Sequence, residues 1–84
     1  MSKDITERIL LRAGFKYKGV GVLNIITDGH SIDITCVLIV IDEREWKCIT
    51  YNKDYVPTAD IMIQTVDHFN KLMELMDINF RIEE

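Results

Sequence analysis

The sequence predicts a single α+β domain, covering residues 1–84, whose elements follow the order α-β-β-β-α-β. The length of 84 residues suits one small domain with a single core. Two segments repeat apolar residues at the helical spacing of three and four, and the middle of the chain alternates apolar and polar residues as strands do. The simplest architecture is a mostly antiparallel sheet with the helices packed on one of its faces.

The first predicted element is a short helix that begins at Asp4 and ends near Gly14. Asp4 is a suitable N-cap because Glu7 follows it at capping-box spacing. Gly14 stands where a helix commonly ends with a left-handed residue, and Phe15 follows as the hydrophobic contact that closes such an end.

The middle of the chain predicts three strands, the first of which ends before Asp28-Gly29. This dipeptide is a strong signal for a tight hairpin, because both central residues of the turn adopt positive φ. Residues 32–41 carry apolar side chains on both faces, which is typical of a central strand with both faces at least partly covered. A charged turn at 42–45 leads into the third strand, at 46–51.

The closing part of the chain predicts a loop, a helix and a strand. Residues 52–57 read as a loop, because the proline at its end cannot continue a central strand. Apolar residues from Met62 to Met76 step by four and three, so we expect a helix over about 59–76 with Thr58 as its N-cap. The alternation at 78–82 predicts a final half-buried strand.

Composition and charge narrow the classes of function. Hydrophobic residues make up 48% of the chain, which is typical of a globular rather than a disordered protein. The net charge of −4 weighs against sequence-independent binding to DNA or RNA, which depends on Lys and Arg. The first residues are too polar for a signal peptide, and the apolar run at 36–41 is too short to span a bilayer. We therefore expect a cytoplasmic protein without a membrane partner.

The two cysteines, Cys36 and Cys48, are predicted to be buried thiols. A disulfide-stapled secreted domain of this size usually carries four or more cysteines. Both residues fall on positions expected to face inward, where a free cysteine behaves as a small hydrophobic residue. A disulfide between them remains the alternative, if the hairpin register brings the two positions together.

The whole chain resembles the short uncharacterised proteins of Bacteroides-type bacteria and of their phages and mobile elements. The resemblance rests on the stretch Ile9–Phe15 that ends the opening helix, on the β meander, and on the stretch Val66–Leu75 before a short apolar strand. It implies a small α+β fold and a dispensable accessory role. It carries over no catalytic or binding residue.

No constellation of residues predicts catalysis, a cofactor or a metal site. The two histidines, His30 and His68, form no His-x-x-x-His pair. No nucleophile motif surrounds Cys48, and sequence cannot place it beside His68 and Asp67 as a catalytic set. The acidic residues within 42–45 lack the glycine and the ligand spacing of a calcium loop. We expect a protein that is not an enzyme and that uses no cofactor.

The apolar second face of the central strand is the feature with functional content. Something must cover the apolar side chains of this face, which are Val37, Ile39 and Ile41. The cover is either a helix of the same chain, a second copy in a homodimer, or an unidentified protein partner. The first hypothesis is therefore a non-enzymatic protein-protein interaction or accessory protein. Aromatic residues dominate interface hot spots, so we expect three aromatic residues to anchor the partner. These are Trp46, Tyr51 and Tyr55.

The alternative hypothesis is a nucleic-acid-associated accessory protein. Basic and aromatic residues are interleaved between positions 12 and 18, a mixture that can contact phosphates and stack on bases. The stretch is short and the net charge opposes it, so nucleic acid is the less favoured partner. The residues concerned are Arg12, Lys16, Tyr17 and Lys18.

Overall fold

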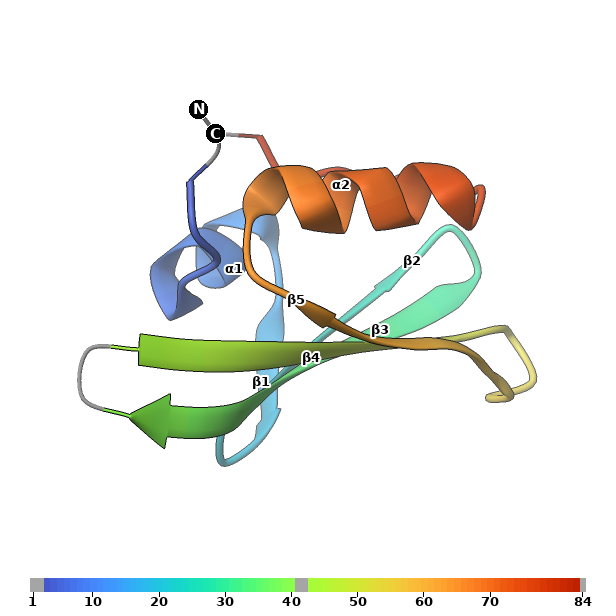
Figure 1. Ribbon diagram of the computed structural model, residues 1–84. Coiled ribbons are helices and arrows are strands. Elements are labelled where there is room, and N and C mark those ends of the chain that lie inside the picture. The colour runs from blue at the N-terminus through green and yellow to red at the C-terminus, as the bar shows by residue number, and fades with distance from the viewer. Residues whose placement is uncertain (1–2, 41–42, 84) are drawn as a thin grey trace.

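One five-stranded antiparallel sheet forms the base of the structure, and two helices lie on the same side of it (Figure 1). The computed structural model describes residues 3–40 and 43–83, with side chains described for all of these except 38–40, 43 and 44. The strand order follows the chain, so each strand pairs with its sequence neighbour. The elements are α1 (Glu7–Ala13), β1 (Lys16–Gly19), β2 (Val22–Thr27), β3 (His30–Val40), β4 (Glu43–Tyr51), β5 (Pro57–Ile63) and α2 (Val66–Leu75).

The α+β class and the antiparallel sheet with helices on one face are confirmed, but the predicted order of elements is wrong. The observed order is α-β-β-β-β-β-α. The prediction lacks β1 and β5, the two edge strands. It also adds a final strand at 78–82, a segment that pairs with no strand in the described structure.

The first helix begins two residues later than predicted. Thr6, not Asp4, is the N-cap, since its hydroxyl accepts a hydrogen bond from the N–H of Ile9 at 3.2 Å. The predicted end is confirmed. Gly14 adopts φ 109, and the N–H of Phe15 then donates to the carbonyl of Leu10 at 3.0 Å, which closes the helix and turns the buried Phe15 ring into the core.

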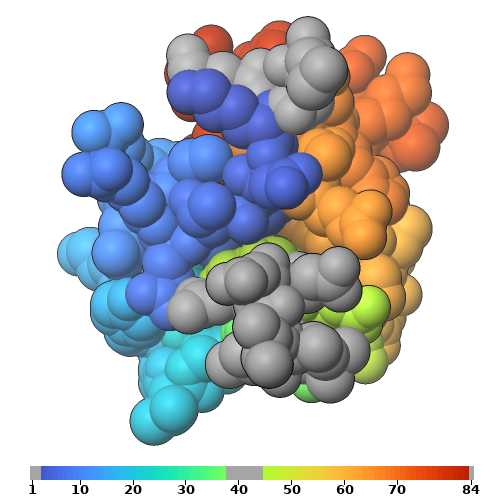
Figure 2. Space-filling model, turned by 60° about the vertical axis from the view of Figure 1, so that its left-hand side comes forward, coloured from blue at the N-terminus to red at the C-terminus, as the bar shows by residue number. Residues whose placement is uncertain are grey.

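The N-terminal residues are tied to the entry of α2. The N–H of Ile5 donates to the carbonyl of Gln64 at 2.8 Å, and the N–H of Val66 donates to the carbonyl of Lys3 at 2.9 Å. These two bonds flank the isolated antiparallel bridge between Asp4 and Thr65, so Asp4 belongs to an extended segment and not to a helix cap. Figure 2 shows these residues lying between α1 and the segment that enters α2.

The turn between β2 and β3 is the tight hairpin that the sequence predicts. Asp28 and Gly29 adopt φ values of 51° and 75°, as the two central residues of such a turn must. The flanking residues Thr27 and His30 pair directly. The Asp28 carboxylate also accepts a hydrogen bond from the backbone N–H of Asn79 at 2.8 Å, so the turn holds the segment after α2.

The predicted helix over 59–76 is wrong in its first third, where the chain forms β5. The side chains of Ala59, Ile61 and Ile63 also satisfy a period of two, and this pattern prevails because the segment pairs with β4. The helix starts only after Thr65, whose hydroxyl accepts from the N–H of His68 at 3.1 Å, so the predicted cap at Thr58 is also wrong.

The segment after α2 is buried as predicted but is not a strand. Ile78 and Ile82 are core residues. The side chain of Asn70 takes the place of a strand neighbour, because its amide nitrogen donates to the carbonyl of Ile82 at 2.9 Å and its oxygen accepts from the N–H of Ile82 at 2.8 Å. The backbone N–H and carbonyl of Ile82 thus have hydrogen-bond partners although this segment pairs with no strand.

Three phenylalanine rings join the elements that lie on the sheet. Phe15 follows α1, Phe69 belongs to α2 and Phe80 belongs to the C-terminal segment. All three pairs of rings meet edge to face, with centroids 6.0 to 6.1 Å apart. Beneath them the sheet contributes the buried side chains of Leu23, Ile32, Ile34, Trp46, Cys48 and Ile63.

We expect Asn70→Ala to lower the free energy of unfolding by about 1–3 kcal/mol, because it leaves two buried backbone groups of the C-terminal segment without partners. Lys71→Ala, on the exposed side of the same helix, is the matched control and should change it by about 0.5 kcal/mol or less. Urea denaturation measures both values. Equal losses for the two variants would contradict the role assigned to Asn70.

Candidate interaction surfaces

The two helices lie over only one of the two faces of the sheet (Figure 1). Side chains such as Ile34 and Cys48 point to the helices and are fully buried, whereas their strand neighbours Asp33 and Ile49 point to the opposite face. We call this opposite side the open face. Its cross-strand rows are Ile26, Ser31, Tyr51 and Pro57; Asn24, Asp33, Ile49 and Asp60; and Val22, Thr35, Lys47 and Met62.

The centre of the open face is a packed polar cluster around Asp33. This residue is only 7% exposed although neither helix lies over it. The amide nitrogen of Asn24 donates to Asp33 Oδ1 at 2.7 Å and to the hydroxyl of Ser31 at 2.9 Å. Lys18 Nζ lies 3.0 Å from Asp33 Oδ2. The hydrogen bond to Asp33 and the charge of Asp33 raise the pKa of Lys18, so this ion pair is formed at neutral pH.

Two of the predicted anchors, Tyr51 and Tyr55, lie beside this cluster. Tyr51 pairs across the strands with Ser31, a residue of this cluster, and Tyr55 lies in the turn that follows Tyr51. Tyr55 is 68% exposed and adopts φ 61. Asn52 holds this turn, because its side-chain oxygen accepts from the backbone N–H groups of Asp54 and Val56 at 2.9 and 3.1 Å. Tyr51 therefore lies next to the polar cluster on the open face, and Tyr55 lies in the turn at the same end of β4.

The other predicted interaction residues lie elsewhere. Trp46 is 1% exposed and belongs to the core, so it offers no surface to a partner, and its buried Nε1 has no hydrogen-bond acceptor among the described residues. Val37 is 47% exposed and sits at a shift of register between β3 and β4. The side chain of Ile39 and the whole of Ile41 lie outside the described residues.

The basic-aromatic stretch does not form one surface. The hydroxyl of Tyr17 donates to Glu7 Oε2 at 2.8 Å, which directs this side chain toward α1. Lys18 instead lies on the open face with Asp33, and Lys16 alternates with Tyr17 along the same strand. Arg12 is exposed in the last turn of α1. This separation of the aromatic ring from the lysines weighs against a platform on which bases stack.

Both cysteines are free thiols; Cys48 is buried as predicted, whereas Cys36 is only partly buried. They occupy neighbouring rather than opposite positions, since Cys36 pairs with Trp46 and Cys48 pairs with Ile34. Burial, followed by the charges of Asp33 and Asp60, raises the pKa of Cys48 to about 12. A sealed, protonated thiol of this kind is not a nucleophile.

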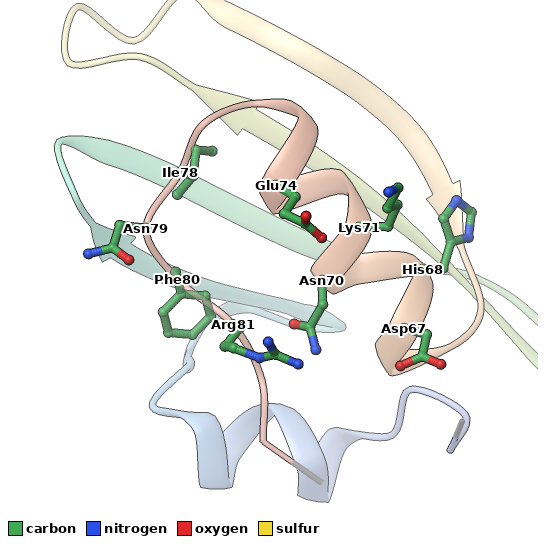
Figure 3. A pocket seen from close by; sticks show the side chains of 9 residues that line it. All are labelled: Asp67, His68, Asn70, Lys71, Glu74, Ile78, Asn79, Phe80 and Arg81. Atoms are coloured by element: carbon green, nitrogen blue, oxygen red, sulfur yellow. The ribbon is translucent and has the colours of Figure 1, made fainter. Parts of the chain in front are cut away.

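A shallow depression lies between α2 and the C-terminal segment (Figure 3). Its lining mixes carboxylates and cations, including Asp67, Glu74 and Arg81. Asn70 belongs to the wall but is committed to Ile82. In Figure 3 the polar side chains spread along both sides of the helix and do not converge on one point. The depression therefore has the form of a seam between packed segments.

The described residues offer neither a metal-binding cluster nor a membrane-spanning helix. No group of three or more His, Cys, Asp and Glu side chains is placed to hold a metal ion within residues 3–40 and 43–83. Neither helix in the described part of the chain has the length and apolar character that a membrane crossing requires.

Comparison with protein-family models, curated proteins and solved structures found no match.

Sequence reasoning missed the polar cluster of Asn24, Ser31 and Asp33. The available signal was the presence of three strongly polar residues at alternating positions of two mostly apolar strands. That signal shows which side of the strands they share, but only the register places Asn24 directly opposite Asp33.

The polar cluster predicts a measurable coupling between Asn24 and Asp33. We expect Asn24→Ala to cost about 1–3 kcal/mol of unfolding free energy, because the buried carboxylate of Asp33 loses a donor. In an Asp33→Ala background the same change should cost less by about 1 kcal/mol. Urea denaturation of the four proteins of this cycle gives the coupling. Strictly additive costs would show that the two side chains act independently.

Because the pKa of the Cys48 thiol is raised, we expect the protein to lose stability at alkaline pH. The native thiol keeps its proton up to a pKa of about 12, whereas the unfolded thiol loses it near its ordinary pKa of 9.0. The unfolded state therefore binds fewer protons in this window, and the free energy of unfolding falls as pH rises from 9 toward 12. Urea denaturation on both sides of pH 9 measures the fall. It should be smaller in Cys48→Ala, and an unchanged pH profile in that variant would contradict the assignment.

Proposed function

We propose that this protein is a non-enzymatic protein-binding module that docks a partner protein on its open face. The observation that carries the proposal is Tyr51 on the sheet face that neither helix covers, followed by the exposed Tyr55 in the adjoining turn. The accessory role implied by the resemblance belongs to the same proposal.

The tyrosines have the chemistry of interface anchors. A tyrosine offers a large apolar ring and a polar tip at a low entropic cost, which is why it is frequent among hot spots. Tyr55 is exposed, yet the hydrogen bonds of Asn52 fix the turn that carries it. Little backbone freedom is therefore lost when a partner covers this residue.

The surroundings of the tyrosines also suit a protein partner. Ile26 and Val56 are exposed apolar residues near the same end of the sheet, and they can exclude water around the anchors. Lys18 is already paired with Asp33, so covering it does not strand an isolated charge. The buried, protonated Cys48 supports the non-enzymatic part of the proposal.

The test is a quantitative capture experiment with matched variants. The immobilised wild type, Tyr55→Ala, Tyr51→Ala and Lys53→Ala are exposed to the same lysate of the source organism, and the retained proteins are quantified by mass spectrometry. Lys53 lies in the same turn as Tyr55 and is exposed, so its variant is the control. We expect at least one protein that the wild type and Lys53→Ala retain and that both tyrosine variants release.

Identical sets of retained proteins for all four baits would contradict the proposal. Oligonucleotide binding that falls steeply with added salt would instead support the nucleic-acid alternative.

A further inference from the structure

The two edges of the sheet are protected to very different degrees. The β1 edge is four residues long and contains two lysines, features that discourage pairing with another strand. The β5 edge is seven residues long, and its single charged residue, Asp60, is 3.2 Å from Lys47 Nζ of the neighbouring strand. In the described structure no strand pairs with β5 on its outer side. The backbone of β5 is thus available to a further strand.

Exposed apolar side chains flank this edge on both sides of the sheet. Ile61 lies on the helix side and Met62, which is 41% exposed, lies on the open face. Figure 3 shows α2 between β5 and the C-terminal segment, with Lys71 on the β5 side. Leu75 follows Lys71 by one turn and is 73% exposed, so it extends the apolar border of the edge.

We propose that a second copy of this chain occupies the edge, with the two β5 strands pairing antiparallel about a twofold axis at Ile61. This dimer joins the two sheets into one. The pairs across the axis are then Ile61 with Ile61, Asp60 with Met62, and Ala59 with Ile63. All of these residues lie before Gln64, where the N-terminal segment takes over the backbone bonding.

The sequence of β5 favours this register over its neighbour. Pairing about Asp60 would set two carboxylates directly opposite each other, which is unfavourable, and would draw in Pro57, which has no N–H to donate. Pairing about Ile61 sets Asp60 opposite the uncharged Met62 of the other copy. Lys47 is the next residue in that row, because it pairs with Met62. A negative and a positive side chain therefore border each Met62, one from each copy.

The dimer goes beyond the proposed function and rests on different residues. It lays two open faces side by side, so a partner with two docking motifs would meet two tyrosine clusters on one rigid body. Loss of the dimer and loss of partner capture are separate readouts, since Tyr51 and Tyr55 are at the other end of the strands from Met62.

The test is sedimentation equilibrium of the full chain over a wide concentration range, with charge variants at one exposed position. The wild type should sediment as a dimer in equilibrium with monomer. Met62→Asp places two pairs of like charges across the axis and should raise the dissociation constant roughly tenfold or more. Met62→Lys faces the Asp60 of the other copy and should dimerise at least as tightly as the wild type. Ile26→Asp, on the open face away from the edge, is the control and should not change the dissociation constant.

A wild type that stays monomeric at every concentration would overturn the proposal. So would Met62→Asp and Met62→Lys weakening the dimer equally, because only the register about Ile61 makes their effects opposite. Far-UV circular dichroism confirms that each variant is folded before its mass is interpreted.

Discussion

Edge-to-face packing of Phe15, Phe69 and Phe80 is the interaction that holds the non-sheet parts of this protein in place. The rings come from the residue that closes α1, from α2 and from the C-terminal segment, which share no strand pairing with one another. Because each ring contacts the other two, the three segments must gather over the same face of the sheet. As a result, neither helix of the described structure lies over the opposite face of the sheet (Figure 1).

The open face meets two requirements at once. It must remain compatible with water, and it must keep the strands in register. Asp33 serves both requirements. A shift of the strand register by one residue would turn its carboxylate into the core, where it would be surrounded by apolar side chains. The donors Asn24 and Lys18 hold it in a fixed place. A sheet pinned in this way presents the tyrosines at one end and the β5 edge at its side as rigid features rather than as an adaptable surface.

Local signals in the sequence predicted local structure well, and the errors arose where distant contacts decide. The hairpin turn at Asp28 and the end of α1 depend on a few adjacent residues, and both are as predicted. The segment of β5 fits both periods, and only its pairing with β4 makes it a strand. The burial of Ile82 was visible, but its partner Asn70 was not. Residue type alone selected Tyr55, which is exposed, and also Trp46, which belongs to the core.

Every strand of the sheet pairs with its neighbour in the chain, so the sheet forms by closing short loops only. Contacts between distant segments, such as Asp28 with Asn79 across 51 residues, belong to the chain ends. During synthesis, α2 and Phe80 leave the ribosome after all five strands, and until then the apolar side of a nearly complete sheet faces solvent. The nascent chain is therefore most prone to aggregate between the emergence of β5 and the docking of α2 over the sheet.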